Sequence, residues 1–351
     1  MHRSNREVNK AGDYLRGNPP LSDETSQMLM IVSDWRSEFE YSLSRVMTTL
    51  RKHTNAQGWK GAIISGRTKR LRSIIAKLGR QSNMDLTQMQ DIGGCRAVMK
   101  DVDTAECLAE SIRSHLHSKV SAGGKSTEDN YISSPKPDGY RSIHFVVRHQ
   151  SNPGTHAPDQ KPRRIEIQIR SIMQHRWATA LETVDLFSSQ TLKTGGGDIR
   201  WRRFFALSSG FFAMMENRPT VPGTPADSAD LRKEMMELAK ELRVVDRLQH
   251  WSKIMEKVLT TKKRDLEDRY TYLIELDVDA GKTNVTAFPP ELLSFAHKRY
   301  LESEKENTNY PNRSTVLVKA HSFKEVQQAY PGFYGDTEAF LYATELVRRG
   351  K

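Results

Sequence analysis

A strand-like stretch near the middle of the chain carries three polar side chains in one row. In "RRIEIQIRS", residues 163–171, isoleucines alternate with Glu166, Gln168 and Arg170. Because strand side chains point alternately to two faces, the isoleucines would face a core and the polar three would share the other face. That row is either a plain solvent face or a site that uses a carboxylate, an amide and a guanidinium together.

The basic segment "RTKRLRSIIAK", residues 67–77, predicts an amphipathic helix that begins at about residue 69. Lys69, Ser73 and Lys77 are spaced four residues apart and would share one face, opposite a buried face of leucine and isoleucine. Like charges on one face repel each other unless an anion lies between them, and lysine suits phosphate as a point charge. The pattern therefore indicates phosphate binding, with a solvated basic face as the alternative.

Two further stretches place chemically useful side chains beside a predicted strand. In "QDIGGCRAVM", Asp91 precedes a glycine pair and a strand that carries Arg96. A carboxylate at a strand edge is a ligand that Mg²⁺ accepts together with phosphate oxygens. In "NYISSPKPDGYRSIHFVV", Tyr140 precedes a strand that carries His144, and an exposed tyrosine ring can stack on a base. Taken singly, a turn aspartate and a loop tyrosine would explain these residues; only together do they indicate one site.

The composition predicts a globular protein with an anionic partner. The chain has 351 residues, 37% of them hydrophobic, and a net charge of +11, which allows two domains with a sizeable core. No run of about 18 apolar residues predicts a membrane span, and the polar first twenty residues predict a cytoplasmic protein. The two cysteines, Cys95 and Cys107, have no metal-binding spacing, which argues against a disulfide framework or a structural zinc.

The elements that would position the polar residues alternate between strands and helices, which predicts an α/β or α+β fold with a mixed sheet. From the N-terminus, the pattern predicts a helical stripe over residues 23–53 and two strands, 94–102 and 141–149, that enclose a helix over 104–116. A polar loop over 150–164 and then, after the isoleucine strand, a helix at about 171–187 follow.

After these elements a proline-rich stretch, "ENRPTVPGTPADSAD", indicates a linker. A long helix over residues 231–258 and a further mixture of strands and helices follow. The predicted organisation begins with an N-terminal helical segment, residues 1–55, and a main α/β domain, residues 56–215. The linker, 216–230, then leads to a C-terminal helix and a smaller α/β domain of regulatory role, 231–351.

Together the four polar stretches resemble the synthetase domain of the RelA/SpoT family. "RTKRLRSIIAK" resembles that family's R-x-K-x₃-S-x₃-K signature, and "DIGGCRAV" resembles its D-x-x-G-x-R-x-V. "YISSPKPDGYRSIH" is similar to Y-I-x-x-P-K-x-x-G-Y-x-S-x-H, and "IEIQIRSIMQHRWA" is similar to its E-x-Q-I-R-T strand with the helix that follows. Four motifs in this order, over roughly residues 45–190, make the match specific.

The resemblance implies a nucleotidyltransferase-like mixed sheet flanked by helices. It also implies an enzyme that transfers the β,γ-pyrophosphate of ATP to a nucleotide 3′-hydroxyl with Mg²⁺, as small alarmone synthetases do. Carried over by motif, Arg67 and Arg96 would sandwich the adenine, while Lys69, Ser73 and Lys77 would hold the ATP phosphates.

The remaining motif residues would serve the metal ion and the acceptor. The resemblance implies that Asp91 and Glu166 hold Mg²⁺, that Glu166 deprotonates the attacking hydroxyl, and that Tyr140 stacks on the acceptor base. Four further residues would line the acceptor or phosphate region: Lys136, His144, Gln168 and Arg170. On this reading, the polar side of the opening strand faces the reaction, which depends mainly on positioning and charge neutralisation.

The chain also departs from the family. It shows no histidine–aspartate hydrolase motif, which predicts synthesis without degradation. Residues 190–351 match nothing in the smallest alarmone synthetases, and Trp177 and Glu182 are spaced differently from the family's helix. Glu182 is therefore assigned no role.

The acceptor is open between two classes. The loop "PKPDGYRSIH" favours GDP or GTP, and hence synthesis of (p)ppGpp, which is our expectation. The extra domain and the positive charge favour a toxin-type acceptor, either the 3′ CCA end of tRNA or an adenine nucleotide. A tRNA would need further cations, for which the candidates are Arg163, Arg164, Arg200, Arg202 and Arg203.

A non-catalytic RNA-binding module is a further alternative. Intact Asp91 and Glu166 argue against it, because binding alone needs no pair of metal ligands. The sequence does not decide the oligomeric state, and a homo-oligomer is one of the alternatives.

Overall fold

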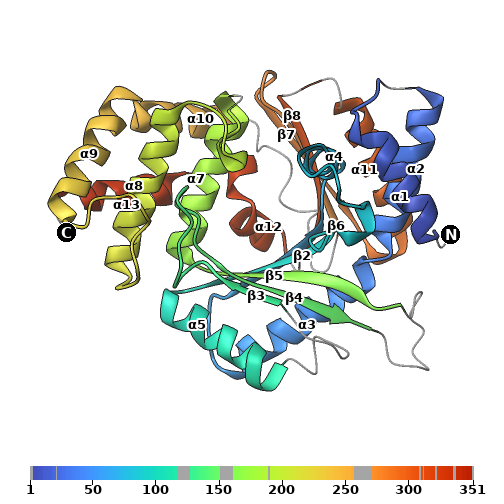
Figure 1. Cartoon of the computed structure of the whole chain (residues 1–351), viewed down its shortest axis with the longest axis horizontal. Coiled ribbons are helices and arrows are strands. Elements are labelled where there is room, and N and C mark those ends of the chain that lie inside the picture. The colour runs from blue at the N-terminus through green and yellow to red at the C-terminus, as the bar shows by residue number, and fades with distance from the viewer. Residues whose placement is uncertain are drawn as a thin grey trace.

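One mixed sheet of eight strands runs through the molecule, with helices on both sides (Figure 1). The computed structural model describes residues 3–20, 22–116, 127–150, 161–188, 190–256, 271–307, 310, 312–320, 322–334 and 337–349. The strands are β1 Ile63–Thr68, β2 Gly93–Met99, β3 Thr127–Asn130, β4 Ile143–His149, β5 Arg163–Ser171, β6 Thr271–Asp277, β7 Lys282–Phe288 and β8 Arg313–Lys319. The predicted fold class, a mixed sheet flanked by helices, is confirmed.

The register of the sheet aligns the predicted site residues across three strands. The strand order is β3-β4-β5-β2-β1-β8-β6-β7; β2 and β5 are parallel, and all other neighbours are antiparallel. Gln168 of β5 lies opposite Arg96 of β2 on one side and His144 of β4 on the other. Partners in register share a face of the sheet, so these three side chains form one row.

Twelve helices of the described residues surround the sheet. They are α1 Asn5–Arg16, α2 Asp23–Ser37, α3 Glu40–Ala56, α4 Leu71–Arg80, α5 Val102–Ser111, α7 Ile172–Ser188, α8 Ile199–Met215, α9 Ser228–Glu241, α10 Val244–Glu256, α11 Leu293–Glu306, α12 Phe323–Ala329 and α13 Glu338–Arg349. None of them is both long and apolar enough to cross a membrane.

The isoleucine face of β5 is buried and its polar face is left for the site. Ile165, Ile167 and Ile169 are each 0% exposed and pack with residues of α3 and α5. Each buried side chain of this size contributes about 1.5–3 kcal/mol. Because α3 and α5 cover that face, Glu166 and Gln168 lie on the opposite face, where α7 and α12 pack.

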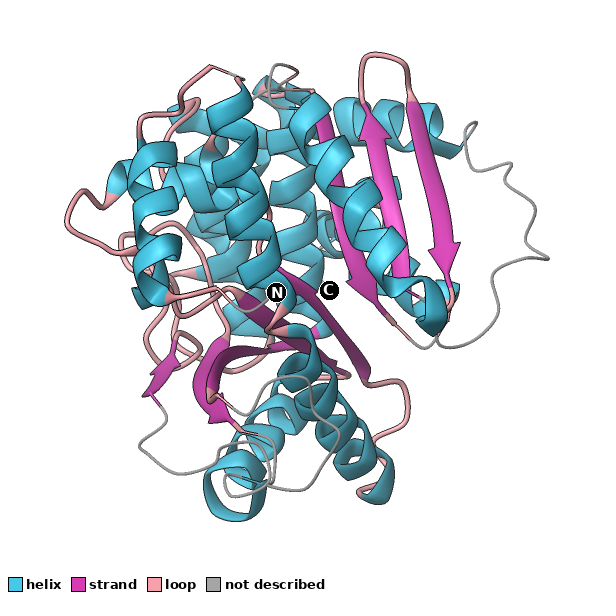
Figure 2. Cartoon of the chain, turned by 90° about the vertical axis from the view of Figure 1, so that its right-hand side faces the viewer, coloured by secondary structure: helices cyan, strands magenta, loops and turns pink. Residues whose placement is uncertain are grey.

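The C-terminal strands extend the same sheet. β8 pairs with β1 through two residue pairs, Gly66 with Lys319 and Arg67 with Val318, and β6 and β7 follow it. Figure 2 shows these three strands as a group beside the strands of the main region. The smaller C-terminal α/β domain therefore shares its sheet with the preceding residues, and the predicted domain boundaries stay a prediction.

Two long predicted helices are each divided in the structure. The stripe over 23–53 forms α2 and α3, which are separated at Phe39. The helix predicted over 231–258 forms α9 and α10, because Arg243 has a left-handed φ of 51°, which a continuous helix does not accommodate. Its last two residues, and residues 151–160 of the predicted polar loop, lie outside the described residues.

The strand β1 and the helix α8 have no counterpart in the sequence-based prediction. α8 is buried nearly all round, with Trp201, Phe204 and Phe205 each 1% exposed. A helix buried on every side lacks the one-sided apolar stripe that reveals a surface helix. β1 begins with only two consecutive isoleucines, which is too short a run to distinguish a strand from a helix.

Candidate active site

Two lysines converge on Asp91, which lies two residues before β2 begins. Lys69 Nζ lies 2.6 Å from Asp91 Oδ2, and Lys77 Nζ lies 3.1 Å from Asp91 Oδ1. The helix α4 begins at Leu71 and not at residue 69, so Lys69 precedes it; the two ammonium groups nevertheless meet. Burial alone would raise the pKa of Asp91, but the two lysines hold it below its ordinary value. The predicted cationic face is therefore present, with a carboxylate at its centre.

Five predicted residues form a closed ring of hydrogen bonds. Tyr140 Oη is 2.7 Å from His144 Nε2, and His144 Nδ1 is 3.1 Å from Glu166 Oε1. Gln168 Nε2 donates to Glu166 Oε2 at 2.6 Å. Arg170 Nη2 donates both to Gln168 Oε1 at 3.0 Å and to Tyr140 Oη at 2.7 Å, which closes the ring.

Burial and hydrogen bonding act in opposite directions on Glu166. Burial raises the pKa of its carboxyl, and so does the nearby Asp91, while the contact with His144 and the bond from Gln168 lower it. The net pKa lies below the ordinary value. Glu166 is thus ionised at neutral pH and can accept a proton.

The loop that carries Tyr140 is held by α7 and α8. Gly139 has a φ of +94°, and a Cβ there would come within 2.9 Å of the Trp177 ring and 3.0 Å of the Phe205 carbonyl oxygen. Trp177 Nε1 donates to that same carbonyl at 2.8 Å. The neighbouring Arg141 is buried and its Nη1 lies 2.7 Å from the carboxylate of Glu216. Only glycine fits this turn, which explains the residue before Tyr140.

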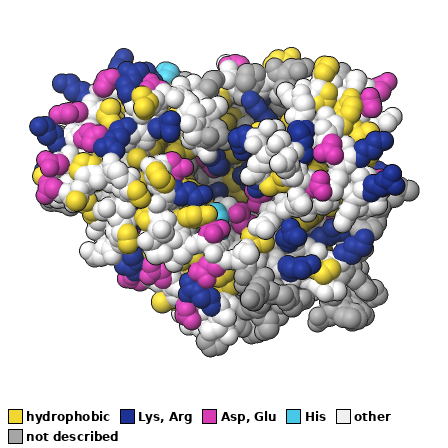
Figure 3. Space-filling model, viewed as in Figure 1, with side chains coloured by type: hydrophobic (Ala, Val, Ile, Leu, Met, Phe, Trp, Pro, Cys, Tyr) yellow, Lys and Arg dark blue, Asp and Glu magenta, His cyan; other side chains and the backbone are white. Residues whose placement is uncertain are grey.

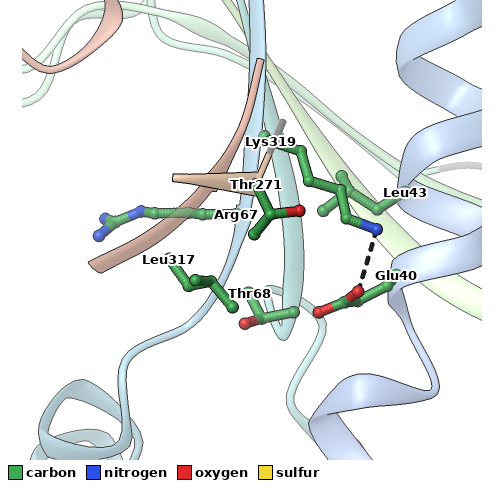
Figure 4. Close-up of a pocket in the computed structure, with 8 residues that line it drawn as sticks. Glu40, Leu43, Arg67, Thr68, Thr271, Leu317 and Lys319 are labelled. Carbon is green, nitrogen blue, oxygen red and sulfur yellow. Dashed lines mark ion pairs between the residues drawn. The ribbon is translucent and has the colours of Figure 1, made fainter. Parts of the chain in front are cut away.

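Arg67 and Arg96 lie on two adjacent strands and face one aromatic ring from the C-terminal region. Their Cζ atoms are 5.8 Å and 5.7 Å from the centre of the Tyr330 ring, within the range of a cation–π contact. Arg96 Nη1 also donates to the Ala329 carbonyl at 2.9 Å. Figure 4 shows Arg67 extending away from the neighbouring Glu40–Lys319 ion pair.

The face shown in Figure 3 is hollowed near its centre, where basic and acidic side chains and a histidine gather. Glu182 of α7 interacts with Arg67 and Arg96 and forms an ion pair with Lys193. Burial would raise the pKa of Glu182, but these cations hold it well below its ordinary value.

Sequence reasoning missed Glu182, Lys193 and Tyr330 as neighbours of the arginine pair. The altered spacing after Trp177 concealed Glu182. The other two lie outside the family motifs, so no local signal marks them.

The other predicted residues lie around these groups. Lys136 Nζ is 4.2 Å from the centre of the Tyr131 ring and 5.5 Å from that of Tyr140, which places it beside the ring of hydrogen bonds. Ser73 is half-buried on α4. The structure thus brings the predicted residues of β1, β2, β4 and β5 to one face of the sheet and sets Lys69, Lys77 and Asp91 beside them. The individual roles of all these residues stay predictions.

Two carboxylates, Asp91 and Glu166, are close enough to repel each other electrostatically. One or two carboxylates that complete their coordination with phosphate oxygens and water are the donor set Mg²⁺ prefers. Among the described residues there is no cluster of three or more acidic, histidine or cysteine side chains around a metal position. The pair therefore fits an ion that arrives with a nucleotide better than an all-protein metal cage.

Most arginines suggested as extra tRNA contacts are used inside the molecule. Arg163 pairs with Glu38, Arg200 with Asp198 and Glu241, and Arg203 with Glu234. The guanidinium of Arg164 donates a hydrogen bond to the Gln88 carbonyl. These three paired arginines would have to give up an internal partner in order to contact a tRNA phosphate.

Comparison with known proteins identifies the region that carries these residues. Residues 66–185 match the model described as the region found in RelA/SpoT proteins. The chain is 32% identical over 118 residues to the GTP pyrophosphokinase YjbM of Bacillus subtilis, a match that covers 33% of this chain and 52% of that protein. It is 28% identical over 155 residues to the GTP pyrophosphokinase of Escherichia coli K12, covering 43% of this chain and 18% of that protein. The chain thus spans about half the length of the first relative and less than a fifth of the second.

Solved structures give a similar but weaker match. The small alarmone synthetase 1 from Bacillus subtilis has a TM-score of 0.43 at 21% identity, covering 63% of this chain and 99% of that one. The same protein bound to its product pppGpp has a TM-score of 0.41 at 23% identity, covering 51% and 89%. Residues 66–185, which match the region found in RelA/SpoT proteins, contain the last three residues of β1 and all of α4, β2, β4 and β5.

Proposed function

We propose that the chain transfers the β,γ-pyrophosphate of ATP to the 3′-hydroxyl of GDP or GTP. The acceptor oxygen attacks the β-phosphorus of ATP, and the bond from that phosphorus to the α,β-bridging oxygen breaks, so that AMP leaves. The hydroxyl proton passes to the carboxylate of Glu166. The relatives named GTP pyrophosphokinase support this proposal, as does the ionised state of Glu166.

The observation that carries the proposal is the juxtaposition of an anion-binding pair and a base. Lys69 and Lys77 lie within 3.1 Å of Asp91, and Asp91 in turn interacts with Glu166. Triphosphate oxygens beside the lysines would lie next to the carboxylate that accepts the proton. Transfer of a phosphoryl-type group needs little beyond such positioning and charge neutralisation.

Mg²⁺ fits the same place. Asp91 and Glu166 would hold it, and the bound ion would neutralise charge on the phosphate oxygens. The lysines then restrain the triphosphate, and Arg67 and Arg96 offer two planar cations to the adenine.

A labelling experiment tests the reaction and its acceptor. Purified protein is incubated with γ-labelled ATP and, in separate tubes, GDP, GTP, AMP or tRNA. We expect label in the guanine nucleotides, a product that persists after ATP is exhausted because no hydrolysis follows, and little dependence on salt. Label confined to tRNA, with a steep loss as salt rises, would contradict the guanine acceptor. Label in no acceptor would contradict the reaction.

We further propose that the C-terminal region regulates access of ATP. The ring of Tyr330 occupies the position beside both Arg67 and Arg96, where the proposed function places adenine. Tyr330 is 7% exposed and packs with Phe333 and other apolar residues of the region. ATP would therefore have to displace this segment. Deletion of residues 217–351 is a poor test, because it removes β8 from the sheet beside β1.

The variant Tyr330→Leu is expected to lower the KM for ATP. Leucine keeps the apolar packing but removes the aromatic face, so the competing cation–π contacts are lost. These contacts are worth about 0.5–2 kcal/mol, which corresponds to a decrease in KM of about two- to thirtyfold. Steady-state kinetics with ATP varied provides the measurement. The control is Tyr342→Leu, a tyrosine on α13 that is 64% exposed. An unchanged or higher KM in a folded Tyr330→Leu protein would show that the segment does not compete with ATP.

A further inference from the structure

When the imidazole carries a single proton, the ring of hydrogen bonds around Glu166 has one consistent arrangement of protons. Arg170 carries only donors, so both Gln168 Oε1 and the oxygen of Tyr140 accept from it. The other end of the amide, Gln168 Nε2, therefore donates to Glu166 Oε2. These assignments leave only the two contacts of the histidine to be decided.

The position of the proton on the His144 imidazole follows from the neighbours on both sides of the ring. An ionised Glu166 offers only acceptors, so His144 must present a proton on Nδ1. A singly protonated imidazole then has an acceptor at Nε2, and the Tyr140 hydroxyl donates its proton there. Every donor that takes part in the ring meets an acceptor in this arrangement.

We propose that the Tyr140 hydroxyl is a positioning group that holds His144 in the Nδ1–H tautomer and, through it, orients the Glu166 carboxylate. The inference rests on the proposed function, in which Glu166 accepts the proton of the attacking hydroxyl. Each carboxylate oxygen receives one hydrogen bond, from His144 on one side and Gln168 on the other. Rotation of the base is thereby restrained, and such restraint of a reacting group accelerates a reaction.

This role is separate from stacking on a base. Stacking uses the face of the Tyr140 ring, whereas positioning uses the hydroxyl at its end. Without that hydroxyl, Nε2 of His144 loses its donor and the other tautomer becomes accessible. That tautomer turns the lone pair of Nδ1 toward Glu166 Oε1, so the hydrogen bond is replaced by repulsion. Loss of the hydroxyl therefore changes the orientation of the reacting carboxylate, but the ring face that would stack on the acceptor base stays unchanged.

The variant Tyr140→Phe separates the two roles, because it keeps the ring and removes the hydroxyl. We expect kcat to fall about three- to tenfold, the effect of losing one neutral hydrogen bond, while the KM for the acceptor changes less than about twofold. The matched control is Tyr131→Phe. Its ring packs edge-on against both Tyr140 and His144, at 5.9 Å and 5.4 Å between centroids, but its hydroxyl is outside the ring of hydrogen bonds.

The control should keep a wild-type kcat. A wild-type kcat in Tyr140→Phe, a change in its KM alone, or an equal fall in Tyr131→Phe would overturn the positioning role. Circular dichroism of all variants confirms that each is folded.

The tautomer is measured directly by ¹⁵N NMR of histidine-labelled protein near neutral pH, with His144→Gln used to assign the signal. Wild-type His144 should carry its proton on Nδ1 alone, and Tyr140→Phe should show a mixture of both tautomers. An Nε2–H tautomer or a doubly protonated ring in the wild type overturns the inference. Because this readout needs no turnover, it separates the two proposals. A wild-type protein that shows the expected tautomer but transfers no pyrophosphate would contradict the proposed function and still support the inferred tautomer of His144.

Discussion

Replacing Glu166 by glutamine is expected to lower the rate of pyrophosphate transfer by about 10²–10⁴-fold, the usual contribution of general acid–base catalysis. Glutamine has the shape of glutamate but neither its charge nor its basicity. His144 and Gln168 hold the wild-type carboxylate in its ionised form, so the variant removes the proton acceptor and a proposed metal ligand together. Single-turnover labelling with γ-labelled ATP is the measurement.

The control for this variant is Glu275→Gln. Glu275 is a half-buried glutamate on β6 of the same sheet and lies outside the site residues. It should transfer at the wild-type rate, and circular dichroism should show both variants folded. Near-normal turnover in Glu166→Gln would remove Glu166 from the proposed mechanism.

The second large effect concerns stability. The variant Glu304→Gln is expected to reduce the free energy of unfolding by about 3–5 kcal/mol, the usual cost of removing one partner of a buried ion pair. Glu304 Oε2 lies 2.9 Å from Arg36 Nη1, and the two side chains are 7% and 2% exposed. Burial alone would lower the pKa of Arg36, but Glu304 and Tyr300 raise it above its ordinary value. Without the carboxylate, a guanidinium stays buried with no countercharge.

Glu304 also joins three parts of the molecule. It extends from α11 to Arg36 of α2, and its Oε1 accepts from the backbone N–H of Leu71, the first residue of α4. A carboxylate at that position is favoured by the positive end of the helix dipole. The same variant therefore weakens the contact that positions the basic helix.

Urea unfolding measures the stability change. The matched control is Glu302→Gln, two residues earlier on α11, where the side chain is 41% exposed and pairs with Arg299 of the same helix. Exposed pairs of this kind contribute about 0–1 kcal/mol, so the control should be nearly neutral. A loss below about 1 kcal/mol in Glu304→Gln would mean that water or another group compensates Arg36.

The sequence by itself determined the local elements and the residues they present. The alternation in β5 places Ile165, Ile167 and Ile169 in the core, because the two-residue period of a strand follows from backbone geometry alone. The order of the four motifs likewise located the residues that match the RelA/SpoT model. The strand alternation and each motif lie within short segments, so recognising them does not depend on residues far away in the chain.

Only the tertiary structure decided what lies next to those elements. Nothing near Arg67 in the sequence indicates that β8 pairs beside it, or that Tyr330 faces both Arg67 and Arg96. The same holds for Glu304, which meets Arg36 across 268 residues of chain. Local propensity cannot specify these contacts, because several strand orders bury the same apolar faces and only the packing of the whole molecule selects among them.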